Sequence, residues 1–176
     1  MAEKARVLLV DGYNILGAWP DITKARQFSH ARDILAERLH NYAGYTDQKV
    51  ILVYDAWQSD HMKRSIENRD GLQIVFTQKG ETADQYIERQ CGIYASAIDA
   101  GRLEVRVATS DAVEQTLALG RGAVRLSARE LIYEIVQTTN PSVNRQIKSV
   151  NTGKRMVMDR LSCEVREKLE KMRRGE

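Results

Sequence analysis

Acidic residues follow four strand-like runs of this sequence, and their type and spacing are suited to chemistry at the edge of a sheet. The acids and the runs before them are Asp11 after residues 7–10, Asp55 after 50–54, Glu81 and Asp84 after 72–76, and Asp111 after 105–108. Parallel strands bring their carboxyl ends to the same edge of a sheet, where ligands bind. We therefore expect these side chains to share a cleft.

Such a group of carboxylates is suited to binding a hard divalent cation. Mg²⁺ and Mn²⁺ prefer oxygen ligands and activate a water for attack on a phosphodiester. Two carboxylates about 4 Å apart repel by roughly 4 kcal/mol at an effective dielectric of 20, so a cation best explains the cluster. Asp84 and Glu88 lie four residues apart on one predicted helix face, where like charges are mildly destabilising unless something compensates them. Asp55 and Glu88 are secondary acidic candidates.

Helix capping is the alternative explanation for each acid taken alone. Asp and Glu are favoured at helix N-termini by the exposed amides and the macrodipole, so Glu81, Asp84 and Asp111 could be capping residues. Asn14 could be a left-handed turn residue next to a glycine. The sequence predicts no helix directly after Asp11, so capping does not explain that residue. The coincidence of acids after several strands favours a metal site.

Strand-like and helix-like segments alternate along the chain, which predicts an α/β fold with a mainly parallel sheet. We expect strands at 7–10, 49–54, 71–76, 103–108 and 123–126, and helices at 28–43, 82–100, 111–119 and from 127. Gly44 is predicted to end the first helix, and Thr82 with Gln85 has the spacing of a capping box. Residues 58–69 form a polar, basic segment between two strands.

The length and composition are those of one domain with a tail. The chain has 176 residues, of which 43% are hydrophobic, and we expect a domain at 1–140 and a basic linker with a terminal helix at 141–176. No stretch approaches the roughly 20 apolar residues that cross a bilayer, and residues 1–6 lead straight into a strand, so we expect a cytoplasmic protein without a membrane segment. Cys91, Cys163 and three scattered histidines suggest neither a disulfide framework nor a zinc site.

Positive charge is concentrated in the tail. Residues 141–176 carry ten lysines and arginines against five acids, a net +5, so with +3 for the whole chain the rest carries −2. A cationic extension beside an acidic cleft suits a polyanion presented to a metal site. The alternative is a solvated helix face with internal ion pairs. The basic residues that we expect to contact RNA are His61, Lys63, Arg64 and Arg69 before the third strand, and Lys154 and Arg155 in the tail.

Two aromatic residues near strand ends are candidates for stacking on an unpaired base, and packing within the protein is the alternative for each. These are Tyr13 and Trp57.

Several short segments together resemble the NYN-domain ribonucleases, relatives of the PIN nucleases, and above all their bacterial YacP-like branch. The segments are Asp11-Gly12-Tyr13-Asn14, Tyr54-Asp55-Ala56, Val75-Phe76-Thr77, Gly80-Glu81-Thr82-Ala83-Asp84-Gln85-Tyr86-Ile87-Glu88, Ala108-Thr109-Ser110-Asp111 and Leu126-Ser127-Ala128-Arg129-Glu130-Leu131. The resemblance spans about residues 6–136.

The resemblance implies a PIN-like, Rossmannoid three-layer fold that binds Mg²⁺ or Mn²⁺ and cleaves single-stranded RNA endonucleolytically. It also implies association with the ribosome and with mRNA turnover. On this sequence Asp11, Asp84 and Asp111 would be metal-binding or catalytic carboxylates, and Glu81 is a further catalytic candidate. Asn14 would orient the first acid or a phosphate. The tail extends beyond the shortest family pattern, and no role is carried over to it.

Two other functions remain open from the sequence. One is a non-catalytic RNA- or ribosome-binding module with the same fold that docks through its tail. The other is a phosphatase of another Rossmannoid type, which Tyr13 disfavours, because a phosphoaspartate enzyme would have its second Asp two residues after Asp11. No GxxxxGK[ST] or GxGxxG motif is present, so nucleotide-driven and dinucleotide chemistry lack motif support.

Overall fold

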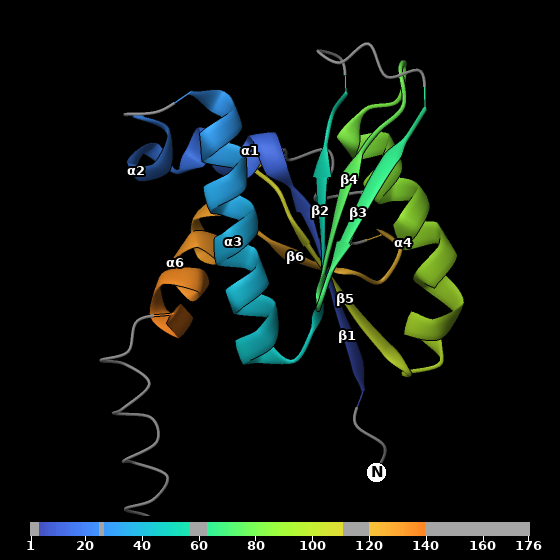
Figure 1. Ribbon diagram of the computed structural model, residues 1–176. Coiled ribbons are helices and arrows are strands. Elements are labelled where there is room, and N and C mark those ends of the chain that lie inside the picture. Colours follow the sequence, from blue (N-terminus) through green and yellow to red (C-terminus); the bar gives the residue numbers. More distant parts are fainter. Residues whose placement is uncertain (1–3, 25–26, 57–62, 111–119, 140–176) are drawn as a thin grey trace, which may run out of the picture. The chain divides into compact units, whose positions relative to one another are not determined.

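The computed structural model describes residues 4–24, 27–56, 63–110 and 120–139, and these form a mostly parallel sheet flanked by helices (Figure 1). The strands are β1 (Ala5–Asp11), β2 (Lys49–Tyr54), β3 (Ser65–Arg69), β4 (Leu72–Phe76), β5 (Leu103–Ala108) and β6 (Val124–Leu126). Within the described residues their order is β3-β4-β2-β1-β5-β6, with β3 antiparallel to β4 and every other pair parallel. The predicted α/β class with a mainly parallel sheet is confirmed.

Helices cover both faces of the sheet, which makes three layers (Figure 1). The helices are α1 (Gly12–Ala18), α2 (Pro20–Thr23), α3 (Phe28–Thr46), α4 (Ala83–Asp99) and α6 (Ala128–Thr139). Side chains of β1 alternate between the faces: Leu8 and Val10 join the core under α1, α2, α3 and α6, whereas Val7 and Leu9 join the core under α4. Burial on both faces is why these strands have continuous apolar runs.

Local sequence signals set several element boundaries. The strands expected at 49–54 and 103–108 have the bounds predicted for them. Thr82 caps α4, and both hydrogen bonds of its capping box with Gln85 are present, as predicted. The prediction that Gly44 ends the preceding helix was wrong, because α3 continues to Thr46. Asp47 ends it instead, in the left-handed conformation with φ of 49°, where its N–H donates to a backbone carbonyl of the last turn.

Three elements were missed from the sequence. Strand β3 lies in the polar segment 58–69, and all five of its residues are exposed, so it has no apolar pattern to reveal it. Gly71, with φ of 72°, lies in the tight turn that joins it to β4. The short helices α1 and α2 were also missed. The helix expected at 111–119 and the tail at 141–176 lie outside the described residues.

None of the helices in the described part of the chain is long and apolar enough to cross a membrane.

Candidate functional site

The carboxyl ends of five parallel strands meet at one edge of the sheet. In the register of the sheet Asp11 of β1 lies beside Val53 of β2, and Tyr54 at the end of β2 lies beside the last residue of β4. On the other side Ala108, the last residue of β5, pairs with the last residue of β6. The residues that follow these strands therefore line a common edge, as the sequence predicted.

Asp11 is the last residue of β1 and is almost fully buried, with 9% of its surface exposed. It is also the N-cap of α1, because its Oδ1 accepts a hydrogen bond from the Asn14 N–H at 3.1 Å. The prediction that no helix follows Asp11 was therefore wrong. Helix α1 has only seven residues and starts at Gly12, where a Cβ would lie 2.3 Å from the Tyr54 ring. Capping and a chemical role are thus compatible explanations of the same carboxylate.

The pKa of Asp11 is raised from 3.8 to about 6. Burial is the largest cause, and the negative charges of Asp84 and Asp55 add to it, while hydrogen bonds from the backbone N–H groups of Asn14 and Tyr13 oppose it. Acids that follow three different strands therefore act on one another electrostatically. The structure brings Asp11, Asp84 and Asp55 to the same edge.

The chemistry of these donors fits a hard divalent cation, because Mg²⁺ and Mn²⁺ prefer carboxylate oxygens and Asp11 is buried with like-charged neighbours. The described residues contain no group of three or more Asp, Glu, His or Cys side chains placed to hold a metal ion. Asp111, the third predicted ligand, lies outside the described residues. The described part of the chain thus supplies two of the three predicted ligands, Asp11 and Asp84.

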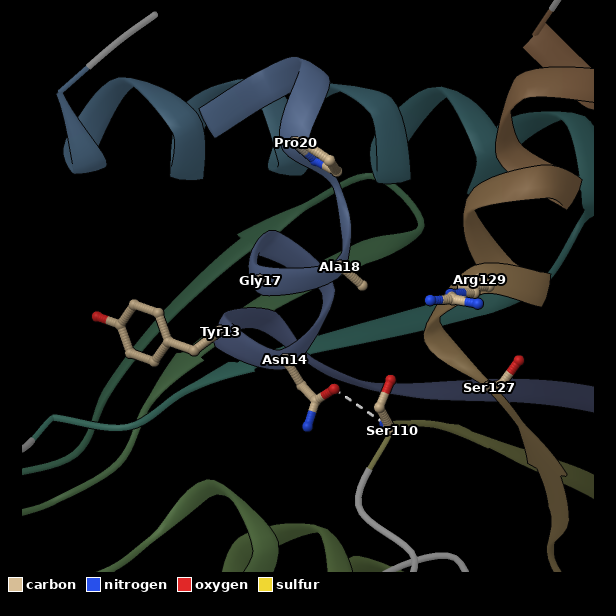
Figure 2. Close-up of a pocket in the computed structure, with 8 residues that line it drawn as sticks. All are labelled: Tyr13, Asn14, Gly17, Ala18, Pro20, Ser110, Ser127 and Arg129. Carbon is tan, nitrogen blue, oxygen red and sulfur yellow. Dashed lines mark hydrogen bonds between the residues drawn. The ribbon is translucent and has the colours of Figure 1, made fainter. Parts of the chain in front are cut away.

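Asn14 joins the first turn of the chain to the end of β5. Its side-chain Oδ1 accepts a hydrogen bond from the Ser110 backbone N–H at 2.9 Å, across 96 residues of sequence (Figure 2). Its own backbone N–H holds Asp11. The residue predicted to orient the first acid therefore also fixes the position of the segment that leads into Asp111.

An open cleft of about 690 Å³ begins beside Asn14. It lies between the α1–α2 segment and the start of α6, with the end of β5 between them (Figure 2). The residues that line it are Tyr13, Asn14, Gly17, Ala18, Pro20, Ser110, Ser127 and Arg129. The side chains of this set are small or polar except for Tyr13 and Pro20, so the cleft has room for a polar ligand.

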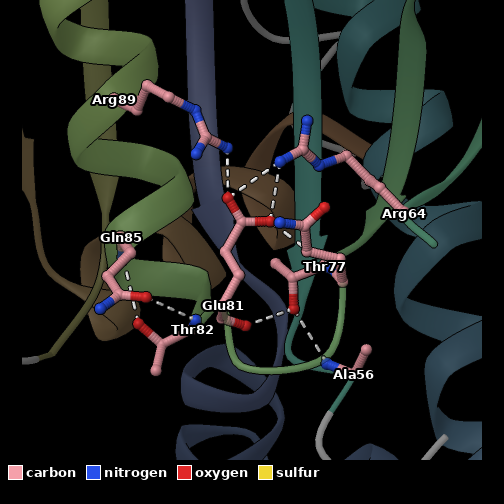
Figure 3. Close-up of polar contacts among 8 residues, drawn as sticks. Ala56, Arg64, Thr77, Glu81, Thr82, Gln85 and Arg89 are labelled. Atoms are coloured by element: carbon pink, nitrogen blue, oxygen red, sulfur yellow. Dashed lines mark hydrogen bonds and ion pairs between the residues drawn. The ribbon is translucent and has the colours of Figure 1, made fainter. Parts of the chain in front are cut away.

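Glu81 is a buried carboxylate whose charge is compensated by two arginines (Figure 3). Arg64 Nη2 donates to both carboxylate oxygens at 2.8 and 2.9 Å, and Arg89 donates to Oε1 from helix α4. Both guanidinium groups also lie over the Tyr86 ring, 5.0 and 5.4 Å from its centroid. Burial acts to raise the pKa of Glu81, but the hydrogen bonds and charges of the two arginines hold it below its usual value.

Thr77 connects the loops after β2 and β4. Its hydroxyl is fully buried, accepts a hydrogen bond from the Ala56 N–H at 3.0 Å and donates one to the Glu81 carbonyl at 2.7 Å (Figure 3). Asp55 directly precedes Ala56, and Asp84 lies in the first turn of α4, which begins shortly after Glu81. One hydroxyl group therefore positions the backbone beside both acids.

The basic residues predicted to contact RNA differ in their surroundings. Arg64 is held by Glu81, and Arg69 lies in β3, where it forms an ion pair with Glu67 at 2.7 Å. Lys63 is exposed at the start of the described segment. The remaining basic candidates lie outside the described residues: His61, Lys154 and Arg155.

The remaining predicted site residues are Tyr13, Glu88 and Trp57. Tyr13 is half-buried, with its ring 5.1 Å from the Tyr54 ring in an edge-on arrangement, and it lines the cleft. Glu88 of helix α4 forms an ion pair with Arg121, with 3.2 Å between the charged groups. Trp57 lies outside the described residues.

Three residues of the site were given no role from the sequence: Thr77, Arg89 and Arg129. Arg89 lies in α4 whereas Glu81 precedes the helix, so helical periodicity does not reveal that pair. Thr77 and Arg129 lie inside segments that carried the family resemblance. The residue type alone does not show that the Thr77 hydroxyl joins two loops or that Arg129 lies in a cleft, because threonine and arginine are also common on the surface.

Comparison with known proteins agrees with the resemblance seen in the sequence. The family model described as YacP-like NYN domain matches residues 8–174. A relative named uncharacterized protein YacP, from Bacillus subtilis, is 39% identical over 175 residues, which cover 97% of this chain and 98% of the relative. These matches continue well past residue 136, so the tail that was set apart from the shortest family pattern lies within the matched length.

Solved structures give the same result. The crystal structure of Rae1 (YacP) from Bacillus subtilis is 35% identical and covers 96% of this chain and 95% of that one, with a TM-score of 0.61. A mutant of the same protein matches with the same identity and TM-score and covers 97% and 96% of the two chains. The chain belongs to the YacP-like NYN domain family, and its domain is of the nuclease type.

Proposed function

We propose that this chain is a metal-dependent endoribonuclease that cleaves single-stranded RNA, and that it acts in the cytoplasm on mRNA in association with the ribosome. The nuclease-type domain supports an RNA substrate. The observation that carries the proposal is the place of Asp11, a buried carboxylate at the carboxyl end of a central strand. Asp84 and Asp55 face the same edge closely enough for their charges to act on it.

The residues that would hold Mg²⁺ or Mn²⁺ are Asp11, Asp84 and Asp111. The bound ion would supply an activated water and would neutralise charge on the phosphate. Among the described residues, the Asn14 N–H binds the Asp11 carboxylate, and the Asn14 side chain accepts from the N–H of Ser110, the residue before Asp111 in the sequence. With the ion bound, hydrolysis by direct attack of water would require no covalent intermediate on the protein.

Two features support the choice of RNA and ribosome. The cleft beside Asn14 is open and lined by small and polar residues, which suits an extended single strand. The net charge of +5 in residues 141–176 suits attachment to a polyanion such as ribosomal RNA.

The test compares Asp11→Asn and Asp84→Asn with wild type on free RNA and on RNA in translating ribosomes. Each reaction is run with Mg²⁺, with Mn²⁺ and with a chelator. Asp99→Asn is the matched control, because Asp99 is exposed and ends α4 at the opposite end from Asp84. We expect cleavage by wild type and Asp99→Asn only with metal present, and loss of cleavage in the other two variants. A folded Asp11→Asn protein that cuts RNA at the wild-type rate would refute the proposal.

The same assay separates the nuclease from a docking module without activity. A chain shortened to residues 1–140 should keep cleavage of free RNA and lose most of its preference for ribosome-bound message. A docking module would bind ribosomes through 141–176 and would produce no metal-dependent cleavage in any reaction. Complete absence of cleavage by wild type on both substrates would therefore favour the docking module.

A further inference from the structure

Arg129 is an arginine on the wall of the cleft. It is exposed at the second position of α6, and it forms no hydrogen bond or ion pair within the part of the chain that the structure describes. The acid next to it, Glu130, is used elsewhere: its Oε2 accepts from the Ser127 N–H at 2.7 Å, and its own N–H donates to Ser127 Oγ at 3.2 Å. This capping pair leaves the Arg129 guanidinium to face the cleft (Figure 2).

The wall opposite Arg129 consists of small residues. Gly17, Ala18 and Pro20 line it, and a Cβ placed on Gly17 would have no neighbouring atom within 4 Å. Gly17 lies inside helix α1, where glycine is less favourable than alanine by roughly 0.5–1 kcal/mol. The folded chain itself therefore gives no packing reason for a glycine at this position, whereas a ligand in the cleft would need the space.

Polar groups lie between these two walls. Asn14 uses its Oδ1 to accept from the Ser110 N–H, while its side-chain NH₂ donates to none of the described residues. Ser110 and Ser127, each with a hydroxyl group, line the same cleft (Figure 2). Donors of this kind, with a guanidinium above them, match the oxygen atoms of a phosphodiester.

We infer that this cleft binds the nucleotide next to the scissile bond of a single-stranded RNA, with Arg129 as the residue that binds its phosphate. The inference rests on the proposed function and adds a substrate-positioning residue to it. Tyr13 and Asn14 line the cleft and lie two and three residues after Asp11 in the sequence, so a strand that leaves the cleft on this side would pass toward the Asp11 carboxylate. Gly17 provides the space for the sugar and base opposite the guanidinium.

The first experiment measures RNA affinity in the full-length Asp11→Asn protein, so that the probe stays intact. The probe is a short fluorescein-labelled oligouridine, followed by anisotropy at several salt concentrations. Arg129→Ala should weaken binding about tenfold, as expected for one lost charge-assisted contact. It should also reduce the slope of log affinity against log salt by about 0.7, the value for one phosphate of a single strand. Arg125→Ala is the matched control, because it removes an exposed arginine from β6 outside the residues that line the cleft.

The second experiment fills the cleft instead of removing its charge. Gly17→Leu should weaken binding at least as much as Arg129→Ala, because Gly17 lines the cleft, its Cβ position has no neighbouring atom within 4 Å, and the larger side chain would occupy space that the ligand needs. Gly44→Leu is the control, since Gly44 is also an exposed glycine inside a helix, α3, with no atom within 4 Å of its Cβ position. Circular dichroism and thermal unfolding check that both variants fold.

The outcomes distinguish this inference from the nuclease proposal. Unchanged affinity and salt slope in Arg129→Ala, or equal effects of Arg129→Ala and Arg125→Ala, would overturn the cleft as the binding site. Metal-dependent cleavage by wild type would still support the nuclease in that case. Absence of both cleavage and oligouridine binding by the protein with an intact cleft would overturn both.

Discussion

Two buried carboxylates at the same edge of the sheet have opposite electrostatic surroundings. Glu81 is bound by two arginines, and its pKa is held below the usual value. Asp11 has only backbone N–H donors against its burial and the charges of Asp84 and Asp55, and its pKa rises to about 6. The first carboxylate is neutralised by the protein itself, whereas the second lacks a cation among the described residues.

The difference separates acids that hold the fold from acids available for chemistry. A buried ion pair with good geometry is a structural element, and removal of one partner is costly because it leaves an uncompensated charge. A buried acid whose pKa is shifted upward next to other acids is a candidate for a functional site. On this basis we assign Glu81 to positioning the loop before α4, and we propose that Asp11 and Asp84 are the acids that take part in the reaction.

The largest expected effect is on cleavage. Loss of a supporting group around a metal ion costs about 10- to 100-fold in activity, so Asp11→Asn, which removes a direct ligand, should lower the rate by at least about a hundredfold. Glu81→Gln should lower it by less than about tenfold, because Glu81 acts only through the position of its loop. Initial rates per mole of folded protein measure both. Equal losses in the two variants would place Glu81 in the reaction as well.

In stability the order of the two variants should be reversed: Glu81→Gln should lose more than Asp11→Asn. Glu81→Gln leaves two guanidinium groups without their carboxylate, which should lower the free energy of unfolding by about 2 kcal/mol at neutral pH. Because the pKa of Glu81 is lowered in the folded state, its contribution is present above the usual pKa and is lost as the pH falls through the folded value. The difference between wild type and Glu81→Gln should therefore shrink in acid, which urea unfolding at several pH values measures.

Asp11→Asn is the control for this stability measurement. A raised pKa means that ionisation of Asp11 opposes folding, and its stabilising protonated form is lost as the pH rises from 3.8 to about 6. The metal-free Asp11→Asn protein should therefore be at least as stable as wild type at neutral pH. Asn can accept the same hydrogen bond from the Asn14 N–H, so a clear loss of stability in Asp11→Asn would mean that the charge of Asp11 stabilises the fold, against this prediction.

Strands that are buried on both faces could be predicted from the sequence, whereas an exposed strand could not. Strands β2 and β5 were predicted with their bounds because both of their faces are covered, which leaves a continuous apolar run. Strand β3 is exposed along its whole length, and its hydrogen bonds to β4 fix its conformation, so no local pattern reveals it. Helix α1 is too short for periodicity, and it depends on the Asp11 cap and on the burial of Ile15 and Leu16.

The site was predictable to a similar extent. The rule that parallel strand ends share an edge placed Asp11, Asp55 and Asp84 together before any coordinates. The partners of Glu81 were not predictable in the same way. Arg64 lies 17 residues before it and reaches it only because the unpredicted hairpin of β3 and β4 folds back. Sequence shows which residues carry charge, whereas tertiary structure decides which charges are compensated.

Thr77 offers an intermediate test, because it connects the two kinds of carboxylate. Thr77→Val keeps the shape of the side chain but leaves the Ala56 N–H and the Glu81 carbonyl without their buried partner. An unsatisfied buried group costs about 1–3 kcal/mol, so the free energy of unfolding should fall by about that amount. Thr77→Ser keeps the hydroxyl and should lose less. A larger loss in Thr77→Ser than in Thr77→Val would mean that packing of the methyl group, and not the hydrogen bonds, stabilises the loops.

The smallest expected effect is a shift in the pKa of Asp11, and it tests directly whether Asp84 lies close to Asp11. In metal-free protein Asp84→Asn removes a negative charge that raises the pKa of Asp11, so this pKa should fall below about 6. It should stay above 3.8, because burial is the larger cause and is unchanged. Carboxyl-carbon NMR titration of Asp11 measures the shift, with Glu88→Gln as the control, since Glu88 lies one turn further along α4 and pairs with Arg121. An Asp11 pKa that moves equally in both variants would mean that net charge, and not the proximity of Asp84, determines it.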